Sequence, residues 1–355
     1  MEEHNEENQP SQAQPVPSHI DPVEEVLGNE EESLAFKSRL DLTELSHNVQ
    51  KIKSEVGKVI VGQHDMIEML IASLLAKGHS LIEGVPGIAK TVTAKLLSKT
   101  LSVGFSRIQF TPDLMPSDIL GTSVFNLKTS DFEFKKGPIF SNMILIDEIN
   151  RAPAKTQAAL FEVMEEQQIT MDGTRYDLAP PFMVLATQNP VEQEGTYRLP
   201  EAQLDRFLFK INVDYPNLND EIEILKREHQ LKDTAKTETI ASFLTSEQIA
   251  KYQHLVSQVL IEEHLMSYIA QIIVATRNNQ YLYLGASPRA SIAILKASKA
   301  FAAMKGRDFV SPEDIKRAAI PVLHHRVIVT PEREMEGLTS SDIIKQIIEM
   351  TEIPR

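Results

Sequence analysis

The chain carries the run Gly84-Val85-Pro86-Gly87-Ile88-Ala89-Lys90-Thr91, which follows a short apolar stretch and precedes a helical pattern that begins at Val92. A strand, a glycine-containing loop and a helix in this order are the context of a phosphate-binding loop. Glycines let the backbone curl so that its N–H groups point at an anion, and the N-terminus of the following helix adds positive charge. The run therefore predicts a phosphate cradle within an α/β fold.

Two side chains at the end of this loop supply the chemistry that such a cradle needs. Lys90 can reach the β- and γ-phosphates of a nucleotide, and the Thr91 hydroxyl can ligate Mg²⁺. Ala89 departs from the general pattern, in which a glycine precedes the lysine. Taken alone, the run is also compatible with a glycine-rich turn that binds nothing, so the residues downstream decide between the two interpretations.

A pair of acidic residues follows the apolar run Met143-Ile144-Leu145-Ile146. A buried strand here would carry Asp147 and Glu148 to its C-terminal end, where open α/β sheets bind their ligands. Two carboxylates in such a place are costly unless a cation or a catalytic task uses them. We expect Asp147 to hold Mg²⁺ and Glu148 to orient and deprotonate an attacking water. Without the phosphate loop, a helix N-terminus that favours acids would explain the pair equally well.

A further polar group ends another predicted strand, which covers residues 182–186 and leads into Thr187-Gln188-Asn189-Pro190. Asn189 could hydrogen-bond the γ-phosphate or the attacking water. By itself, an Asn-Pro pair is more often a turn.

The chain divides by composition into a tail and two folded parts. Residues 1–36 are rich in Glu, Asn, Gln and Pro with few apolar residues, and are predicted to be a disordered acidic tail. Ten acidic residues precede the first basic residue, Lys37, so removing their charge from the net charge of −14 leaves −4 for the rest. Residues 37–217 are predicted to form an α/β core, and residues 218–355 a smaller, all-helical domain.

Hydrophobic periodicity predicts the elements of these two parts. Helices over 43–56 and 66–76 precede five apolar runs of strand length, at 80–83, 106–110, 143–146, 182–186 and 208–213. Helical segments separate most of these runs, which points to a five-stranded parallel sheet covered on both faces. After residue 218 the strands are expected to stop, and helical patterns follow at 219–230, 246–260, 263–279, 287–304 and 311–324.

The bulk composition excludes several classes of protein. No apolar run reaches the roughly 18 residues that a bilayer-spanning helix needs, and the N-terminus lacks the features of a secretory signal. The chain has no cysteine, which excludes disulfides and thiolate chemistry and favours a cytoplasmic location. The mild acidity of the folded part argues against nucleic acid as a partner.

The order of these pieces resembles the AAA+ ATPases and, more narrowly, the MoxR family. The resemblance covers about residues 42–330 and rests on the phosphate loop, Gln-Phe-Thr-Pro-Asp-Leu-Met-Pro-Ser-Asp-Ile-Leu-Gly (109–121), Asp-Glu-Ile-Asn-Arg-Ala-Pro (147–153), Ala-Thr-Gln-Asn-Pro (186–190), Glu-Gly-Thr-Tyr-Arg-Leu-Pro-Glu-Ala-Gln-Leu-Asp-Arg-Phe (194–207) and Ser-Pro-Arg-Ala (287–290). Ala89 is itself similar to the MoxR version of the loop. The resemblance implies an ATPase with an AAA+ P-loop core and a helical lid, and it implies that residues 84–92 bind ATP with Mg²⁺.

The resemblance also implies roles for residues outside the loop. Arg206 resembles an arginine finger that acts on ATP held by the neighbouring subunit, where a guanidinium neutralises charge on the γ-phosphoryl group. Arg151 could face the neighbouring site instead. Arg289 resembles the sensor 2 arginine of the lid, which contacts ATP in its own subunit. Gly62 and Gln63 resemble a segment that packs near adenine.

Two segments have the pattern of β-hairpins. Residues 122–137 alternate apolar and polar around a Lys-Thr-Ser-Asp turn, and residues 167–178 contain Asp172-Gly173 between two strand-like stretches. The family resemblance implies that such hairpins face the pore of a ring and contact a client protein. Packing between neighbouring subunits is an equally weighted alternative.

The function implied by the resemblance is chaperone-like remodelling of a protein partner by a ring, expected to be a hexamer. MoxR-type ATPases pair with proteins that carry a von Willebrand factor A domain, and no such domain lies in this chain, so the partner is expected to be separate. Two other functions stay open. One is a nucleotide-gated switch with little turnover. The other is a DNA-dependent motor, because the arginine-finger motif and the insertion also resemble those of minichromosome maintenance helicases.

Overall fold

The structure, a computed structural model, describes residues 39–190, 197, 199–230 and 240–354. The predicted tail over residues 1–36 lies outside this part of the chain, as do residues 194–196 and 198 of the family-like motif at 194–207. Among the described residues we find no helix with the length and apolar character that crossing a bilayer requires.

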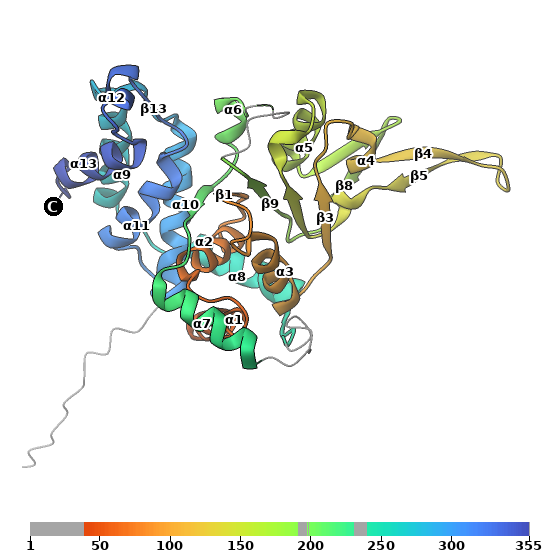
Figure 1. Cartoon of the computed structure of the whole chain (residues 1–355), viewed down its shortest axis with the longest axis horizontal. Coiled ribbons are helices and arrows are strands. Elements are labelled where there is room, and N and C mark those ends of the chain that lie inside the picture. The colour runs from red at the N-terminus through yellow and green to blue at the C-terminus, as the bar shows by residue number, and fades with distance from the viewer. Residues whose placement is uncertain (1–38, 191–196, 198, 231–239, 355) are drawn as a thin grey trace, which may run out of the picture. The chain divides into compact units, whose positions relative to one another are not determined.

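A parallel sheet of five strands forms the centre of the molecule (Figure 1). Its strand order is β10 (Phe209–Val213), β1 (Ser80–Gly84), β9 (Met183–Gln188), β6 (Met143–Asp147) and β3 (Phe105–Gln109). All neighbouring strands pair in parallel. The predicted five-stranded parallel sheet is confirmed, and each predicted run becomes a strand. Because the strands are parallel, the loops that follow β1, β6 and β9 meet at one edge of the sheet.

Both faces of the central strands are buried, which is why their sequences are continuous apolar runs rather than alternating ones. On one face, Ile82 and Leu145 join the apolar cluster of α1 (Thr43–Gly57), α2 (His64–Leu75) and α3 (Lys90–Thr100). On the other face, Leu81 and Ile144 join a second cluster, to which α5 (Ala154–Glu166) contributes. The shorter elements of this part are α4 (Pro116–Leu120), α6 (Glu201–Leu204) and the 3₁₀ turns η1 (Pro138–Phe140) and η2 (Ile149–Arg151).

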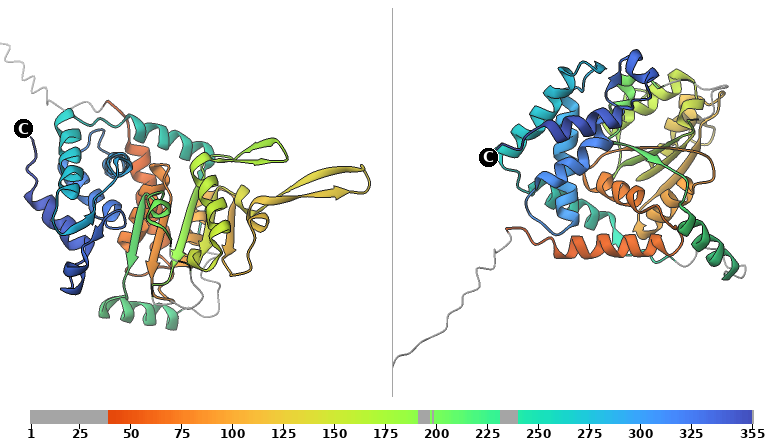
Figure 2. Two further views of the ribbon diagram at one scale, coloured as in Figure 1. Left: turned by 90° about the horizontal axis from the view of Figure 1, so that it is seen from above. Right: turned by 60° about the vertical axis from the view of Figure 1, so that its left-hand side comes forward.

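Two β-hairpins extend from the same side of the molecule (Figure 2). The first pairs β4 (Gly121–Asn126) with β5 (Asp131–Lys136), and the second pairs β7 (Gln168–Met171) with β8 (Thr174–Asp177). In the second, Asp172 and Gly173 both have positive φ (50° and 78°), as a two-residue hairpin turn of this composition needs. Both predicted hairpins are confirmed.

Helices dominate the chain after β10. They are α7 (Leu218–Gln230), α8 (Ser246–Gln258), α9 (Glu263–Arg277), α10 (Pro288–Met304), α11 (Pro312–Leu323), α12 (Pro331–Met335) and α13 (Ser340–Met350). The expectation that strands stop after residue 218 is wrong in detail. β11 (Leu244–Thr245) pairs with β2 (Leu101–Ser102), and β12 (Leu282–Leu284) pairs with β13 (Ile328–Val329). Strands of two or three residues are too short to show a period in the sequence.

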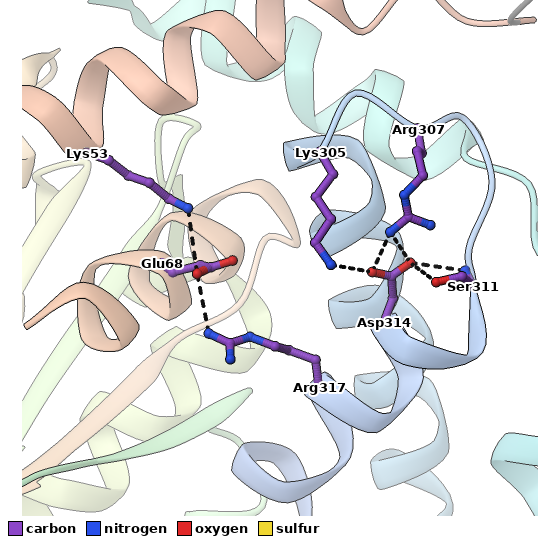
Figure 3. Close-up of polar contacts among 7 residues, drawn as sticks. All are labelled: Lys53, Glu68, Lys305, Arg307, Ser311, Asp314 and Arg317. Carbon is purple, nitrogen blue, oxygen red and sulfur yellow. Dashed lines mark hydrogen bonds and ion pairs between the residues drawn. The ribbon is translucent and has the colours of Figure 1, made fainter.

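Charged contacts join these helices to the first helices (Figure 3), and an aromatic contact joins them to the sheet. Arg317 of α11 donates to Glu68 of α2 at 3.3 Å, and Lys53 of α1 pairs with the same carboxylate at 3.6 Å. Phe301 of α10 stacks on Phe209 of β10 with ring centroids 6.0 Å apart. One apolar cluster therefore runs from the sheet into α10 and α11. The division between core and lid at residues 217 and 218 stays a prediction.

Candidate functional site

The phosphate loop forms the turn between β1 and α3. A Cβ on Gly84 would lie 2.7 Å from the carbonyl oxygen of Val213, so the close approach of β10 requires glycine there. Gly87 (φ 89°) and Ala89 (φ 61°) both have left-handed backbone. Glycine adopts this conformation freely, whereas alanine is strained there by roughly 1 kcal/mol. The position before the lysine thus has the geometry for which the general pattern uses glycine.

Lys90 begins α3, and its ammonium group lies inside the loop. Its Nζ donates to the carbonyl oxygen of Gly84 at 2.5 Å and to that of Gln188 at 3.3 Å. The first acceptor ends β1 and the second ends β9. The lysine charge therefore lies at the C-terminal edge of the sheet, where the sequence predicts that phosphates bind.

Asp147 ends β6, is only 5% exposed and is surrounded by polar groups. The hydroxyls of Thr91 and Thr187 donate to its Oδ1 at 3.2 Å and 3.1 Å. Arg107 of β3 pairs through Nε with Oδ2 at 2.6 Å. A carboxylate beside hydroxyl oxygens is the type of ligand set that Mg²⁺ prefers. The residues present therefore fit the predicted ion, and the guanidinium of Arg107 supplies the positive charge beside Asp147 in this structure.

Glu148 follows Asp147 with left-handed backbone (φ 58°), and its N–H donates to the Thr187 hydroxyl at 3.1 Å. Its Oε2 accepts a hydrogen bond from Gln109 Nε2 at 2.7 Å and pairs with Arg151 Nε at 3.0 Å. The predicted catalytic carboxylate is thus held by two neighbours, one from β3 and one from η2. The contact also shows that Arg151 reaches the acidic pair of its own chain.

One cavity of about 340 Å³ collects these groups at the C-terminal edge of the sheet. Its lining combines the phosphate loop, the acidic pair and the ends of β3 and β9, namely Pro86, Gly87, Ala89, Lys90, Thr91, Val92, Arg107, Gln109, Asp147, Glu148, Thr187 and Asn189. Asn189 is nearly buried, at 8% exposed. The structure therefore brings together the five residues predicted to act on the phosphates and the metal, Lys90, Thr91, Asp147, Glu148 and Asn189.

Other predicted contacts of the nucleotide do not line this cavity. Gly84, Val85 and Ile88 belong to the loop without lining the cavity, and Ile88 is 6% exposed. Gly62 and Gln63 lie beside the end of β10, because the Gln63 amide reaches the carbonyl oxygen of Asp214 at 3.5 Å. Their contact with adenine stays a prediction.

The two remaining predicted arginines meet at a second place. Arg206 follows α6, Arg289 lies in the first turn of α10, and both bind Glu165 in the last turn of α5. Arg206 Nη1 forms an ion pair with Oε2, and Arg289 Nη2 donates to Oε1 at 2.7 Å. Both arginines line a cavity of about 220 Å³, and neither lines the cavity of the phosphate loop.

Asp205, the neighbour of Arg206, fastens the arginine pair to the C-terminal helices. Its Oδ1 pairs with Arg326 Nε at 2.7 Å, and its Oδ2 accepts a hydrogen bond from the hydroxyl of Ser287, which precedes α10, at 3.0 Å. Arg326 is 8% exposed and also donates to the carbonyl oxygens of Asp205 and Phe207. The position of Arg289 relative to Arg206 is therefore fixed by several buried contacts.

Sequence reasoning missed four residues that take part in these two places. Arg107 and Gln109 alternate with apolar residues on β3, and this period of two would have placed them on one face beside the acidic pair. Thr187 belongs to the motif at 186–190, in which the sequence indicated a role for Asn189 alone. Glu165 is one of several acids at the end of α5, and no local pattern distinguishes it from Glu166.

Comparison with known proteins agrees with this geometry. The model of the ATPase family associated with various cellular activities (AAA) matches residues 79–209, and that of the AAA lid domain matches residues 274–347. The uncharacterized protein YeaC of Bacillus subtilis is 44% identical over 304 residues, which cover 86% of this chain and 94% of YeaC.

Two further relatives extend the match. The protein named Chaperone MoxR1 of Mycobacterium tuberculosis is 39% identical over 318 residues, covering 87% of this chain and 83% of that one. A crystal structure of a candidate ATPase from Cytophaga hutchinsonii superposes with a TM-score of 0.81 at 43% identity, over 88% of this chain and 97% of that one. Identity at this level over nearly the whole of both chains shows that this chain belongs to the MoxR family of AAA+ ATPases.

Proposed function

We propose that this protein hydrolyses ATP in a Mg²⁺-dependent reaction, assembles as a ring and uses the reaction to remodel a protein partner. The observation that carries the proposal is the single cavity in which the phosphate loop, Lys90, the Thr91–Asp147 pair and Glu148 lie together. A phosphate loop alone needs no carboxylate pair. A base beside a metal ligand is what hydrolysis of a phosphoanhydride requires.

Each residue has a defined task in this proposal. Backbone N–H groups of the loop and the N-terminus of α3 bind the phosphates, and Lys90 leaves the carbonyl oxygens of Gly84 and Gln188 to neutralise the β- and γ-phosphates. Thr91 and Asp147 would hold Mg²⁺, which neutralises phosphate charge when it is bound. Glu148 orients the attacking water and takes its proton, and Asn189 hydrogen-bonds the γ-phosphate or that water.

We further propose that Arg206 and Arg289 both act on ATP of the neighbouring subunit. Their place beside Glu165, outside the phosphate-loop cavity, favours this over the contact of Arg289 within its own subunit that the family resemblance implies. Arg151 pairs with Glu148 of its own chain, which favours Arg206 as the arginine that crosses the interface. A site that needs arginines from the next subunit implies a closed ring, and we propose a hexamer.

The hairpins are the proposed contact with the protein partner. The tip of β4–β5 exposes Phe125, Leu127 and Phe132, which are 46%, 86% and 69% accessible, and the two rings pack edge to face with centroids 5.2 Å apart. Exposed apolar side chains on a projecting element are typical of interaction sites. We propose a separate partner with a von Willebrand factor A domain, as the family resemblance implies, and a cytoplasmic location, which the composition favours.

Two variants test the reaction. Glu148→Gln keeps the shape of the side chain and removes the base, so we expect ATP binding to persist while phosphate release falls by roughly 10²–10⁴-fold. Lys90→Ala should abolish binding of a fluorescent ATP analogue. If Glu148→Gln turned over ATP at the parent rate while Lys90→Ala lost binding, the assignment of Glu148 as the base would be wrong. A parent protein that binds ATP and releases hardly any phosphate would instead be a nucleotide-gated switch.

The partner is tested by capture with the Glu148→Gln protein in the presence of ATP. Recovery of a von Willebrand factor A protein that is released by ADP would support the remodelling role. Recovery of nucleic acid alone, with ATP turnover stimulated by DNA and weakened by salt, would replace it with a DNA motor.

A further inference from the structure

We propose that Glu165 is a positioning residue that holds Arg206 of the core and Arg289 of the lid side by side, so that both reach one phosphate of the neighbouring subunit. The inference rests on the proposed function, in which these arginines act across the interface. Glu165 itself touches no nucleotide in this account and acts only through the two guanidinium groups.

The contacts of Glu165 divide its carboxylate between the two arginines. Oε2 pairs with Arg206 Nη1, and Oε1 accepts from Arg289 Nη2 at 2.7 Å. Two guanidinium groups so close together repel each other, and a shared carboxylate between them offsets that repulsion. Without Glu165, we expect the two side chains to separate into different rotamers.

Glu165 on α5 and Arg289 on α10 each carry a charge that the dipole of their own helix disfavours. Glu165 stands in the last turn of α5, whose C-terminal end is the negative end of the helix dipole, and no basic residue lies in that turn. Arg289 stands in the first turn of α10, at a positive end, and no acidic residue lies in that turn. Each charge is thus unfavourable on its own helix and is stabilised by the other across the gap. This arrangement is explained by a need for the arginines at this place.

The ion pairs of Glu165 with Arg206 and Arg289 leave N–H groups of both arginines available to bind a phosphate. The contacts in the described part of the chain occupy Nη1 of Arg206, which also donates to the Phe161 carbonyl oxygen at 2.9 Å, and Nη2 of Arg289. A guanidinium carries five N–H groups, so most donors of each arginine remain. Lys296 and Arg326 line the same cavity and add positive charge. An anion that approaches this surface would therefore meet two guanidinium groups held in fixed positions rather than two mobile side chains.

The backbone that carries Arg206 and Arg289 is held in place by contacts that do not involve Glu165. Asp205 ties the start of α10 to the loop of Arg206 through Ser287 and Arg326. The main-chain distance between the two arginines therefore does not depend on Glu165. Its removal should loosen the side chains and leave the fold in place.

The experiment mixes two inactive chains. A donor chain, Lys90→Ala, has intact arginines and cannot bind ATP. An acceptor chain, Arg206→Ala, binds ATP and cannot supply the arginine to its neighbour. Mixed rings should regain phosphate release, because each donor next to an acceptor completes one site. Failure to regain activity would overturn the proposed action across the interface, and the role of Glu165 with it.

Glu165→Ala is then introduced into one chain at a time. In the donor, we expect kcat of the mixture to fall about tenfold with little change in KM, as is typical when a reacting group loses its orientation. In the acceptor, the same substitution should cost less than twofold, which also shows that the variant folds. Glu165→Gln in the donor, which retains an acceptor oxygen, should recover part of the loss.

Glu166→Ala in the donor is the matched control, because it removes an adjacent acid of the same helix turn that binds neither arginine. It should leave the mixture unchanged. If unsubstituted mixtures regain activity and Glu165→Ala in the donor has no effect, Glu165 is not a positioning residue while the proposed function stands. Equal losses in donor and acceptor would assign it a purely structural role.

Discussion

At the scale of single residues, His79 shows how a buried polar side chain can be fully satisfied without any catalytic task. The ring is 6% exposed and connects β9 with the end of α5. Its Nδ1 accepts a hydrogen bond from the Val184 N–H at 3.0 Å, so the proton lies on Nε2, which donates to the Met164 carbonyl oxygen at 3.1 Å. A second proton, on Nδ1, would place that N–H group against the N–H group of Val184. Burial accordingly lowers the pKa of His79 to about 4.

This pKa predicts a pH dependence of stability. Below the unfolded pKa of 6.5 the unfolded chain gains a proton at His79 that the folded chain refuses until about pH 4. The free energy of unfolding should therefore be complete above pH 6.5 and fall as the pH drops, by up to about 3 kcal/mol at pH 4. Urea unfolding of the parent and of His79→Gln between pH 4 and 8 measures this.

The variant is expected to be less stable at neutral pH and to lose stability less steeply on acidification. His325, whose pKa burial also lowers, is present in both proteins, so the difference between their slopes reports His79 alone. Identical slopes would show that His79 takes up its proton equally in both states.

Gln109 predicts an effect on turnover rather than on stability. Its amide donates a hydrogen bond to Glu148 Oε2 at 2.7 Å, and we expect this bond to restrain the carboxylate that would activate the water. A hydrogen bond to a charged group contributes about 1.5–3 kcal/mol, and its loss should free Glu148 to act. We expect Gln109→Leu to raise basal phosphate release about three- to tenfold.

Ser106→Ala, on the same strand, removes a hydroxyl that contacts Ser141 rather than the acidic pair, and it should leave the rate unchanged. A fall in the rate of Gln109→Leu would mean that Gln109 helps to orient Glu148 for the reaction instead of restraining it.

At the scale of elements, Asp314 stabilises the start of α11 from a fully buried position (Figure 3). Its carboxylate accepts two hydrogen bonds from Arg307, at 2.7 and 2.8 Å, and one from Lys305 at 3.1 Å. It also accepts one from the Ser311 N–H and one from the Ser311 hydroxyl, both at 3.0 Å, as a capping box does. A single side chain thus caps a helix and closes the turn before it.

Asp314→Ala should therefore destabilise the protein by roughly 2–4 kcal/mol, because it removes the cap and leaves Arg307 without its buried partner. Lys53→Ala is the control, since it breaks a half-exposed pair with Glu68 that contributes at most about 1 kcal/mol. Urea unfolding compares the two. Equal losses would show that the buried carboxylate contributes no more than an exposed pair.

The elements also show which parts of the structure the sequence could predict. The strands of the sheet were predictable because both of their faces are buried, which makes each a bounded apolar run. The Asp172-Gly173 hairpin was predictable because its turn needs positive φ. The short pairs β2–β11 and β12–β13 were not, because strands of two or three residues show no period. In the site, Lys90 and Thr91 follow from local spacing, whereas the meeting of Glu165 with Arg206 depends on how α5, α6 and α10 pack.

At the scale of the whole molecule, the two halves of the proposed site lie at different places on one chain. The phosphate loop and the acidic pair line one cavity, and the two arginines line another. The first holds two carboxylates and two cations and would become negative when it carries the nucleotide phosphates, while the second holds four cations and two carboxylates. Opposite charges of this kind favour association of one copy's first cavity with the next copy's second. ATP should therefore act as a bridge between subunits as well as a substrate.

This bridging role predicts that assembly depends on ATP and on the arginine pair. The Glu148→Gln variant is expected to bind ATP without hydrolysing it. When ATP is added to this variant, its sedimentation coefficient should rise from that of small species to that of a ring of about six chains, in line with the proposed hexamer. Replacing Arg206 and Arg289 with Ala in that background should abolish the shift. At protein concentrations too low for assembly, binding of a fluorescent ATP analogue should stay within about twofold of the parent, because neither arginine lines the phosphate-loop cavity of its own chain. Replacing the exposed Arg175 and the partly exposed Arg333, which lie outside both cavities, removes the same charge and should leave the shift intact. A ring that forms equally well without Arg206 and Arg289 would show that ATP bound by one chain is not held by the next.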